Sequence, residues 1–356
     1  MRRLFFTVTL IAFSICGFSQ FHTIPLKNHI GPLEGTVYNL PKTILIIEVE
    51  TKRTIETPGK YYQYAERYLG LTDVCKSEII NNEISSVKLI LKPVPDNLNS
   101  YLLINKKIKN SKNTIELTKD GFLKSINGVT SENPVKKSFS PAIRTTLPKE
   151  YRTMESSIMT KEMQQSTSTA KIAELAASEL FNIRETRLNI LTQDIDKTPS
   201  DGMSYEIVLG ELNRMEKFYS ELFTGKREII NEKKTIEVDP SEELESILFR
   251  FSQTNGIIDK SDLSGSPIYI KIKNQKDIKI ENLSAKKDKK AKKEESVSLY
   301  YRLPGKAKVN ITHGNDLLLE KEVTISQFGE VLTLPDGNYV TVEMCPLTGS
   351  LLKLTE

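Results

Sequence analysis

The sequence predicts an α+β protein with three parts: an N-terminal β-rich domain containing one short helix, a central antiparallel helical hairpin, and a C-terminal β-sandwich-like domain. Three observations lead to this prediction. Early in the chain, β-branched runs such as TILIIEVE at Thr43–Glu50 have the length and composition of strands. Two long segments in the middle place apolar residues three and four apart, as amphipathic helices do. After them, short apolar runs separated by Gly, Pro and Asn are typical of a β-sandwich.

Residues 1–19 have the anatomy of a secretory signal peptide. A basic pair at residues 2–3 precedes the apolar run Leu4–Ile15, which is too short to span a bilayer. The small residues Gly17 and Ser19 then occupy the −3 and −1 positions of a cleavage site. Cleavage after Ser19 makes Gln20 the mature N-terminus. The protein is therefore expected to be exported, to the periplasm or the periphery of the outer membrane.

Cys16 offers an alternative to this cleavage, because a lipid-modified cysteine can follow a short signal. The residue before such a cysteine should be small, and here it is the bulky Ile15. We therefore expect ordinary cleavage rather than lipidation at Cys16. If Cys16 were modified, one lipidated end would tie the protein to a membrane surface.

Composition and charge exclude several classes of protein. Charged residues make up 27% of the chain and Trp is absent, which is ordinary for a globular protein and not for a disordered one. The formal net charge of +4 loses two positive charges with the basic pair at residues 2–3, so no cationic face for nucleic acid is expected. No later apolar run approaches the ~20 residues of a transmembrane helix, so we expect none in the mature chain.

Residues 20–128 form the predicted N-terminal domain. Its strands are expected at Thr43–Glu50, Val87–Leu91, Tyr101–Ile104 and Thr114–Leu117. The prolines within Pro93–Asn97 predict a turn between two of them. One helix is expected over Lys60–Leu69, because Pro58 and Gly59 precede a run with helical spacing and Gly70 can end it.

The middle of the chain predicts a linker followed by two helices. Residues 129–163 lack any hydrophobic period and predict a linker or crossing segment. In residues 164–225, Thr169–Leu191 carries one apolar stripe and the segment from Tyr205 to Leu222 repeats the same spacing. A short polar loop joins them and Gly225 ends the second, so the two helices predict an antiparallel hairpin.

Residues 226–356 form the predicted C-terminal β domain. The segment Ser241–Ser252 fits both a helix start and a strand, and alternation from Ile247 favours the strand. Residues 284–296 are rich in lysine; a solvated loop is the simpler interpretation and docking on an anionic surface the alternative. Turns are expected at Pro304–Gly305, Gly314–Asn315 and Asp336–Gly337. The other strands are expected at Pro267–Lys273, Val297–Leu303, Lys306–Ile311, Leu317–Val323, Gly329–Leu334, Tyr339–Met344 and Leu351–Leu354.

Two cysteines, Cys75 and Cys345, remain after cleavage of the signal. In an oxidising compartment they could form a disulfide that closes most of the chain into one loop. The alternative is two separate thiols that pack as small apolar side chains. The sequence leaves both open.

A search for catalytic and metal-binding motifs finds none. The three histidines, His22, His29 and His313, lack the spacing of a zinc hydrolase. There is no Gly-x-Ser-x-Gly nucleophile elbow and no glycine-rich phosphate loop. No cofactor or metal is therefore expected. A pair of carboxylates that are distant in sequence, as glycoside hydrolysis requires, stays open.

Two clusters are candidates for an interaction surface. Tyr61, Tyr64 and Tyr68 share one face of the short predicted helix and could stack on a glycan; the alternative is packing against a neighbouring sheet. Arg184 and Arg187 lie three apart on one helix face and could bind a carboxylate or phosphate bidentately. The alternative for the arginines is pairing with acids of the partner helix or of the adjoining β domain.

Six short segments, in order, resemble an uncharacterised family of exported proteins of the Bacteroidota, defined by a domain of unknown function. They are PGKYYQYAERYLGL (Pro58–Leu71), IRETRLNIL (Ile183–Leu191), FRFS (Phe249–Ser252), YYRLPGKAKV (Tyr300–Val309), QFG (Gln327–Gly329) and PLTGSLLKL (Pro346–Leu354). The resemblance covers nearly the whole mature chain. It implies the envelope of a Gram-negative cell and implies no chemistry, because the family has no established activity.

These observations favour a non-enzymatic envelope protein that acts as a scaffold, assembly factor or accessory binding subunit, with another envelope protein as partner. The alternative is a periplasmic hydrolase or glycan-processing enzyme that uses a carboxylate pair. That alternative predicts a deep pocket with two carboxylates, one of which has a raised pKa.

Overall fold

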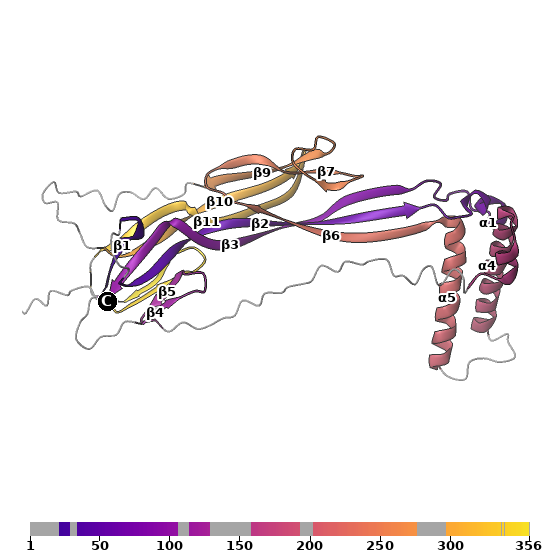
Figure 1. Cartoon of the computed structure of the whole chain (residues 1–356), viewed down its shortest axis with the longest axis horizontal. Coiled ribbons are helices and arrows are strands. Elements are labelled where there is room, and N and C mark those ends of the chain that lie inside the picture. Colours follow the sequence, from indigo (N-terminus) through magenta and orange to yellow (C-terminus); the bar gives the residue numbers. More distant parts are fainter. Residues whose placement is uncertain are drawn as a thin grey trace, which may run out of the picture.

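Two long antiparallel strands, β2 (Thr36–Thr57) and β3 (Ile79–Asn105), form the axis of an elongated molecule. The computed structural model describes residues 21–28, 34–105, 114–128, 158–192, 202–275, 297–335, 337 and 339–355. In Figure 1 the sheets gather toward one end of this axis and the helices stand at the other. The expected signal peptide and Cys16, most of the linker at 129–163, His29 and the lysine-rich loop at 284–296 lie outside the described residues.

The remaining elements are helices and shorter strands. The helices are η1 (Leu26–Asn28), η2 (Tyr62–Tyr64), α1 (Ala65–Leu69), α3 (Lys161–Gln165), α4 (Thr169–Thr192) and α5 (Gly202–Thr224). The strands are β1 (Phe21–Pro25), β4 (Ile115–Leu117), β5 (Leu123–Ile126), β6 (Lys226–Val238), β7 (Leu244–Ser252), β8 (Gly256–Ile258), β9 (Ser266–Gln275), β10 (Val297–His313), β11 (Asp316–Pro335), β12 (Thr341–Met344) and β13 (Leu351–Thr355).

Three antiparallel sheets contain these strands, and two of them mix the two halves of the chain. The ribbon sheet has the order β1-β3-β2-β6, the second sheet β11-β10-β9-β7-β8, and the third sheet β13-β12-β5-β4. This confirms an α+β fold that is mostly antiparallel strand. It differs from the expected separation into domains at 20–128 and 226–356, because β6 pairs with β2 and β12 pairs with β5.

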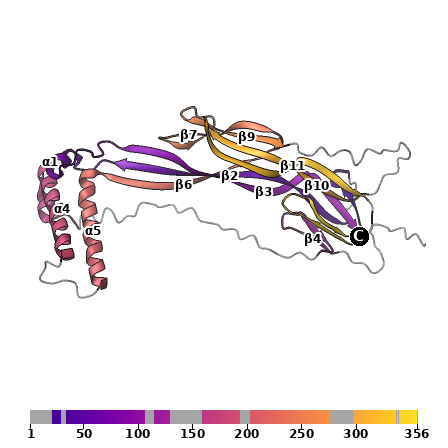
Figure 2. The ribbon, with the colours of Figure 1, turned by 180° about the vertical axis from the view of Figure 1, so that it is seen from behind.

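The sandwich forms between the ribbon sheet and the second sheet, not within the C-terminal part alone. Alternate residues of β2, among them Leu45, Ile47 and Val49, face buried residues of the second sheet such as Ile270 and Val309. Burying one face of each sheet in this way is the usual packing of a sandwich. Beyond the second sheet, β2, β3 and β6 continue together as a three-stranded ribbon to the helices, as Figures 1 and 2 show.

A second core lies at the other end of the ribbon sheet and is rich in tyrosine. The rings of Tyr38, Tyr101 and Tyr300 stack, with centroids 5.5 and 4.2 Å apart. The Tyr38 hydroxyl donates to the backbone carbonyl of Tyr300 and accepts from its N–H, both at 3.0 Å. Burial raises the pKa of Tyr38 far above its ordinary value and that of Tyr101 to about 12. Both phenols therefore stay neutral, and the Tyr38 hydroxyl binds β2 to β10.

Two predicted turns are not turns in the structure. Pro93 and Pro95 lie inside β3, opposite Thr43 and Pro41 of β2. Proline is tolerated there because β3 is an edge strand over this stretch, and a proline whose missing N–H faces away from the partner costs no ladder bond. Pro304–Gly305 is a bulge inside β10, at the register shift between Leu303 and Gly305, so two predicted strands are one. The favoured strand from Ile247 and the turn at Gly314–Asn315 are confirmed.

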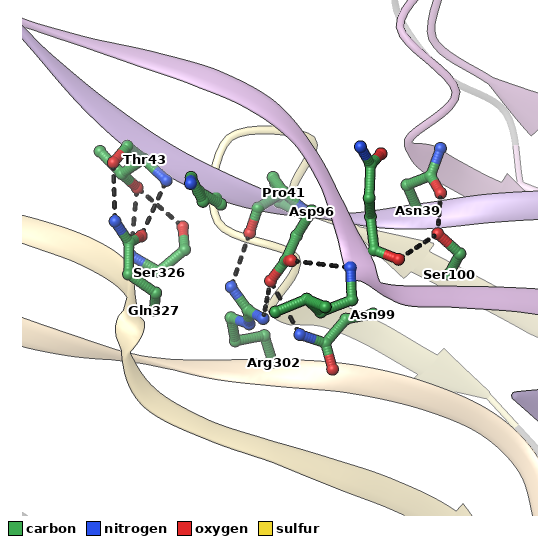
Figure 3. Close-up of polar contacts among 12 residues, drawn as sticks. Asn39, Pro41, Thr43, Asp96, Asn99, Ser100, Arg302, Ser326 and Gln327 are labelled. Carbon is green, nitrogen blue, oxygen red and sulfur yellow. Dashed lines mark hydrogen bonds and ion pairs between the residues drawn. The ribbon is translucent and has the colours of Figure 1, made fainter. Parts of the chain in front are cut away.

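A buried polar cluster, which we call the Arg302 node, ties β10 and β11 to the ribbon sheet (Figure 3). It consists of Pro41, Thr43, Asp96, Arg302 and Gln327. The Arg302 guanidinium donates to the Pro41 carbonyl at 2.9 Å and to the Asp96 carboxylate at 2.8 Å. The Gln327 side chain bonds both the N–H and the carbonyl of Thr43, each at 2.8 Å, as a neighbouring strand would. Only 4% of the Arg302 side chain is exposed, so the node is structural.

The ion pair in the Arg302 node predicts a loss of stability at low pH. Burial raises the pKa of the Asp96 carboxyl, but hydrogen bonds from Arg302 and Asn99 outweigh burial and bring the pKa below its ordinary value. Since the unfolded pKa is about 4, the carboxylate stabilises the fold above that pH and loses its contribution as the pH falls through the lower folded pKa. In urea unfolding over a pH series, the difference between the wild type and Asp96→Asn should shrink below pH ~4. A difference that stays constant into that range would contradict the prediction.

Candidate interaction surface at the helical end

The helices α4 and α5 form an antiparallel hairpin whose base is clasped by the segment between β2 and β3. Arg184 and Arg187 of α4 contact Glu216 and Asn213 of α5, so residue numbers run in opposite directions across the pair. This confirms the predicted helices at Thr169–Leu191 and Tyr205–Leu222 to within a few residues.

The clasp at the base of the hairpin depends on close backbone contact. The Tyr61 N–H donates to the Leu222 carbonyl at 2.7 Å, and a Cβ on Gly59 would lie 2.5 Å from that carbonyl oxygen. Gly225, with a φ of +88°, lets the chain leave α5 and enter β6. The hairpin is therefore fixed at its base to the tip of the ribbon.

The predicted tyrosine face packs on the helical hairpin, not on a sheet. Tyr61 is 1% exposed and its ring lies 6.0 Å from that of Phe223. Tyr64 and Tyr68 are half-buried, with ring centroids 6.1 Å apart, and the Tyr68 hydroxyl donates to the Ala170 carbonyl at 3.3 Å. Tyr61 offers no ring face for a ligand, whereas a binding role for Tyr64 and Tyr68 stays a prediction.

The two predicted arginines pair with the partner helix, which is the alternative given for them above. The Arg184 Nε donates to one oxygen of Glu216 at 2.8 Å, and Arg187 contacts the other oxygen. Arg187 also donates to Asn213 at 3.2 Å. One carboxylate therefore holds both guanidinium groups and fixes α4 against α5.

The two cysteines are free and the structure does not bring them together. Cys75 lines an open hollow of about 620 Å³ between the ribbon and the hairpin, together with Glu56 at the end of β2. Cys345 lies in a turn with Gly349, which packs on Pro41 near the start of β2. Those two points of β2 are roughly 50 Å apart at the rise of a strand, whereas a disulfide requires Cα atoms within about 7 Å. The disulfide considered above is therefore not formed.

The outer surface of the hairpin carries exposed apolar side chains that the sequence prediction missed. Their exposed fractions run from 38% to 75%, and they are Phe181, Leu188 and Leu191 on α4 with Met203, Ile207 and Val208 on α5. A signal for most of them was present in the sequence. Phe181, Leu188, Met203 and Ile207 are apolar but fall off the stripe that pairs the two helices. Large apolar side chains gathered on one exposed element mark an interaction surface.

Within the residues that the structure describes, no group of three or more His, Cys, Asp and Glu side chains is placed to hold a metal ion. The described helices include none that is both long and apolar enough to cross a membrane.

The fold and this surface define an elongated, sheet-rich protein that carries a helical hairpin at the end of a β-ribbon. Residues 34–351 match the family described as a domain of unknown function (DUF4831), and the chain belongs to that family. The match confirms the resemblance to a domain of unknown function over nearly the whole chain. No curated protein and no solved structure matches the chain.

Proposed function

We propose that this protein is a non-enzymatic component of the cell envelope in a Gram-negative bacterium of the Bacteroidota, acting as a scaffold, assembly or accessory subunit that binds another envelope protein. Export is supported by the signal-like residues 1–19 and by the position of the first strand. In that strand Phe21 is 1% exposed and Thr23 donates to the Ser298 carbonyl at 2.6 Å. Cleavage after Ser19 therefore removes the leader and leaves an anchored strand.

The observation that carries the proposal is the exposed apolar face of α5. Met203 and Ile207, four apart and so on one face, are 75% and 67% exposed. The ribbon holds α5 away from the two sheet cores (Figure 2), so a partner that binds the helix need not contact them. Apolar anchors presented on a helix suit docking into a groove of another protein.

The pKa shifts of the acidic residues also support a non-enzymatic role. Among the described carboxyl groups with a shifted pKa, every shift is downward, as a paired or hydrogen-bonded carboxylate requires; these are Glu50, Asp96, Glu211, Asp259 and Asp262. A catalytic acid of a carboxylate pair needs the opposite shift.

The proposal is tested by crosslinking in the native host. A photo-crosslinking amino acid at Ile207 should yield one dominant adduct with another envelope protein, whereas the same group at Leu317 of β11, which is also exposed, should not. Cell fractionation should place the processed chain in the envelope. Equal adduct patterns at both positions, no protein adduct at Ile207, or unprocessed chain in the cytoplasm would overturn it.

A further inference from the structure

A second surface on the hairpin, which we call the α4 stripe, consists of Phe181, Arg184, Glu185 and Leu188. These residues stand at positions i, i+3, i+4 and i+7, so they share one face of the helix. Phe181 is 50% and Leu188 59% exposed, and both charged residues are exposed as well. Ile183, which faces the core of the hairpin, lies on a different side of α4.

The α4 stripe lies on the hairpin helix that is farther from the sheets. Both views place α4 on the side of α5 that faces away from the sheets (Figures 1 and 2). Near the base, Tyr68 of α1 covers the first turn of α4, and Ala173 and Ala177 are buried. Phe181 follows Ala177 by one turn and is exposed, so the cover by α1 ends where the stripe begins. The helix α3 lies against another face of α4, beside Leu175, Ser178 and Asn182.

The sequence of the stripe is complementary to itself. If a second α4 runs antiparallel with the two-fold axis between residues 184 and 185, Phe181 lies opposite Leu188 of the second copy, and Leu188 opposite its Phe181. The same axis sets Arg184 opposite Glu185 of the second copy, and Glu185 opposite its Arg184. We infer that two copies of this chain associate through the α4 stripe as an isologous, antiparallel helix pair. An isologous contact of this kind closes after two copies.

The size of the α4 stripe determines the affinity expected for the dimer. A contact between two helices of this length buries on the order of 1,000 Å² in total, at the low end for specific interfaces. A weak dimer, with a dissociation constant in the micromolar range, is therefore expected.

The first test uses the chain from Gln20 onward and measures its mass by sedimentation over a range of concentrations. The wild type should pass from monomer to dimer as the concentration rises. Leu188→Glu should weaken the dimer by about tenfold or more, because it buries a charge at an apolar anchor. Leu317→Glu, at a similarly exposed position on β11, should leave it unchanged. Circular dichroism checks that both variants keep their helices. A monomer at every concentration, or equal effects of the two variants, would overturn the inference.

The second test uses charge exchange and tests the register. Glu185→Arg places like charges across the axis, and so does Arg184→Glu, so each variant alone should dimerise more weakly than the wild type. Arg184→Glu also removes the ion pair with Glu216 inside the hairpin, so circular dichroism must show that this variant keeps its helices. Mixing the two variants restores opposite charges at both contacts, and the mixture should form a one-to-one heterodimer. A mixture no stronger than either variant would overturn this geometry. The inference rests on the α4 stripe alone and stands or falls separately from the envelope partner proposed for α5.

Discussion

Replacing Arg302 with methionine is expected to lower the free energy of unfolding by about 3–5 kcal/mol. Methionine fills much of the space of the arginine stem, so the loss comes from the charge and its hydrogen bonds. Without the guanidinium, the Asp96 carboxylate stays buried beside Asn99 with no cation, and the Pro41 carbonyl loses its donor. A buried charge left without its partner is among the most costly single changes in a folded protein. Urea unfolding followed by circular dichroism measures the effect.

Two controls separate this ion pair from other contributions. Lys88→Met removes the cation beside Glu50, a 2.8 Å pair on the open face of the ribbon sheet, and should have a much smaller effect because water screens exposed pairs. The double variant Arg302→Met with Asp96→Asn should recover part of the stability lost in Arg302→Met, because no charge is then left unpaired. If the double variant is less stable by the sum of the two single effects, the two residues are not coupled and the prediction fails.

Gly329→Ala is expected to be the second most damaging change, with a loss of about 1–3 kcal/mol or more. Gly329 of β11 lies so close to the bulge of β10 that an added Cβ would lie 1.6 Å from the Leu303 carbonyl oxygen. On the opposite strand, a Cβ on Gly305 would lie 2.6 Å from the Phe328 carbonyl oxygen. Both contacts are with backbone, so two strands must move apart to accept one methyl group. Thermal and urea unfolding measure the loss.

Gly210→Ala is the matched control for this substitution. Gly210 lies inside α5 and a Cβ there would meet nothing within 4 Å. Alanine forms helix better than glycine by about 1 kcal/mol, so this change should stabilise the protein. The same methyl group is therefore expected to act with opposite sign at the two positions. Equal effects at Gly329 and Gly210 would mean that β10 and β11 are not closely packed at the bulge.

Local patterns predicted the helices, and long-range pairing decided the strands. The stripe of Ile172, Ala176, Leu180 and Ile183 depends only on the helical repeat, so both helices of the hairpin could be placed from the sequence. Pro304–Gly305 has the composition of a turn, and nothing local shows that β11 continues past it and makes it a bulge. The sharing of sheets by the two halves of the chain, as when β5 pairs with β12, is equally invisible to local reasoning.

The sequence predicted where in the molecule the candidate surface lies but not which residues form it. The sequence directed attention to the tyrosines and arginines of the helical end, and the structure uses Tyr61, Arg184 and Arg187 largely for internal contacts. The exposed residues Phe181 and Ile207 follow from apolar positions that the pairing stripe does not use. Which apolar side chains a helix leaves exposed depends on how far the neighbouring elements extend along it. The short α1 covers only the base of the hairpin.

The length of β2, 22 residues, also determines how far the hairpin stands from the opposite end of the molecule and how the molecule resists a pulling force. At about 3.3 Å per residue, the strand spans roughly 70 Å. The first and last described strands, β1 and β13, lie at the end of the molecule opposite the helices (Figure 1). Anything bound at that end is therefore held roughly the length of β2 from the hairpin. Tension between the two ends runs along the strands, where the ladder bonds of β2 share the load in shear instead of opening one by one.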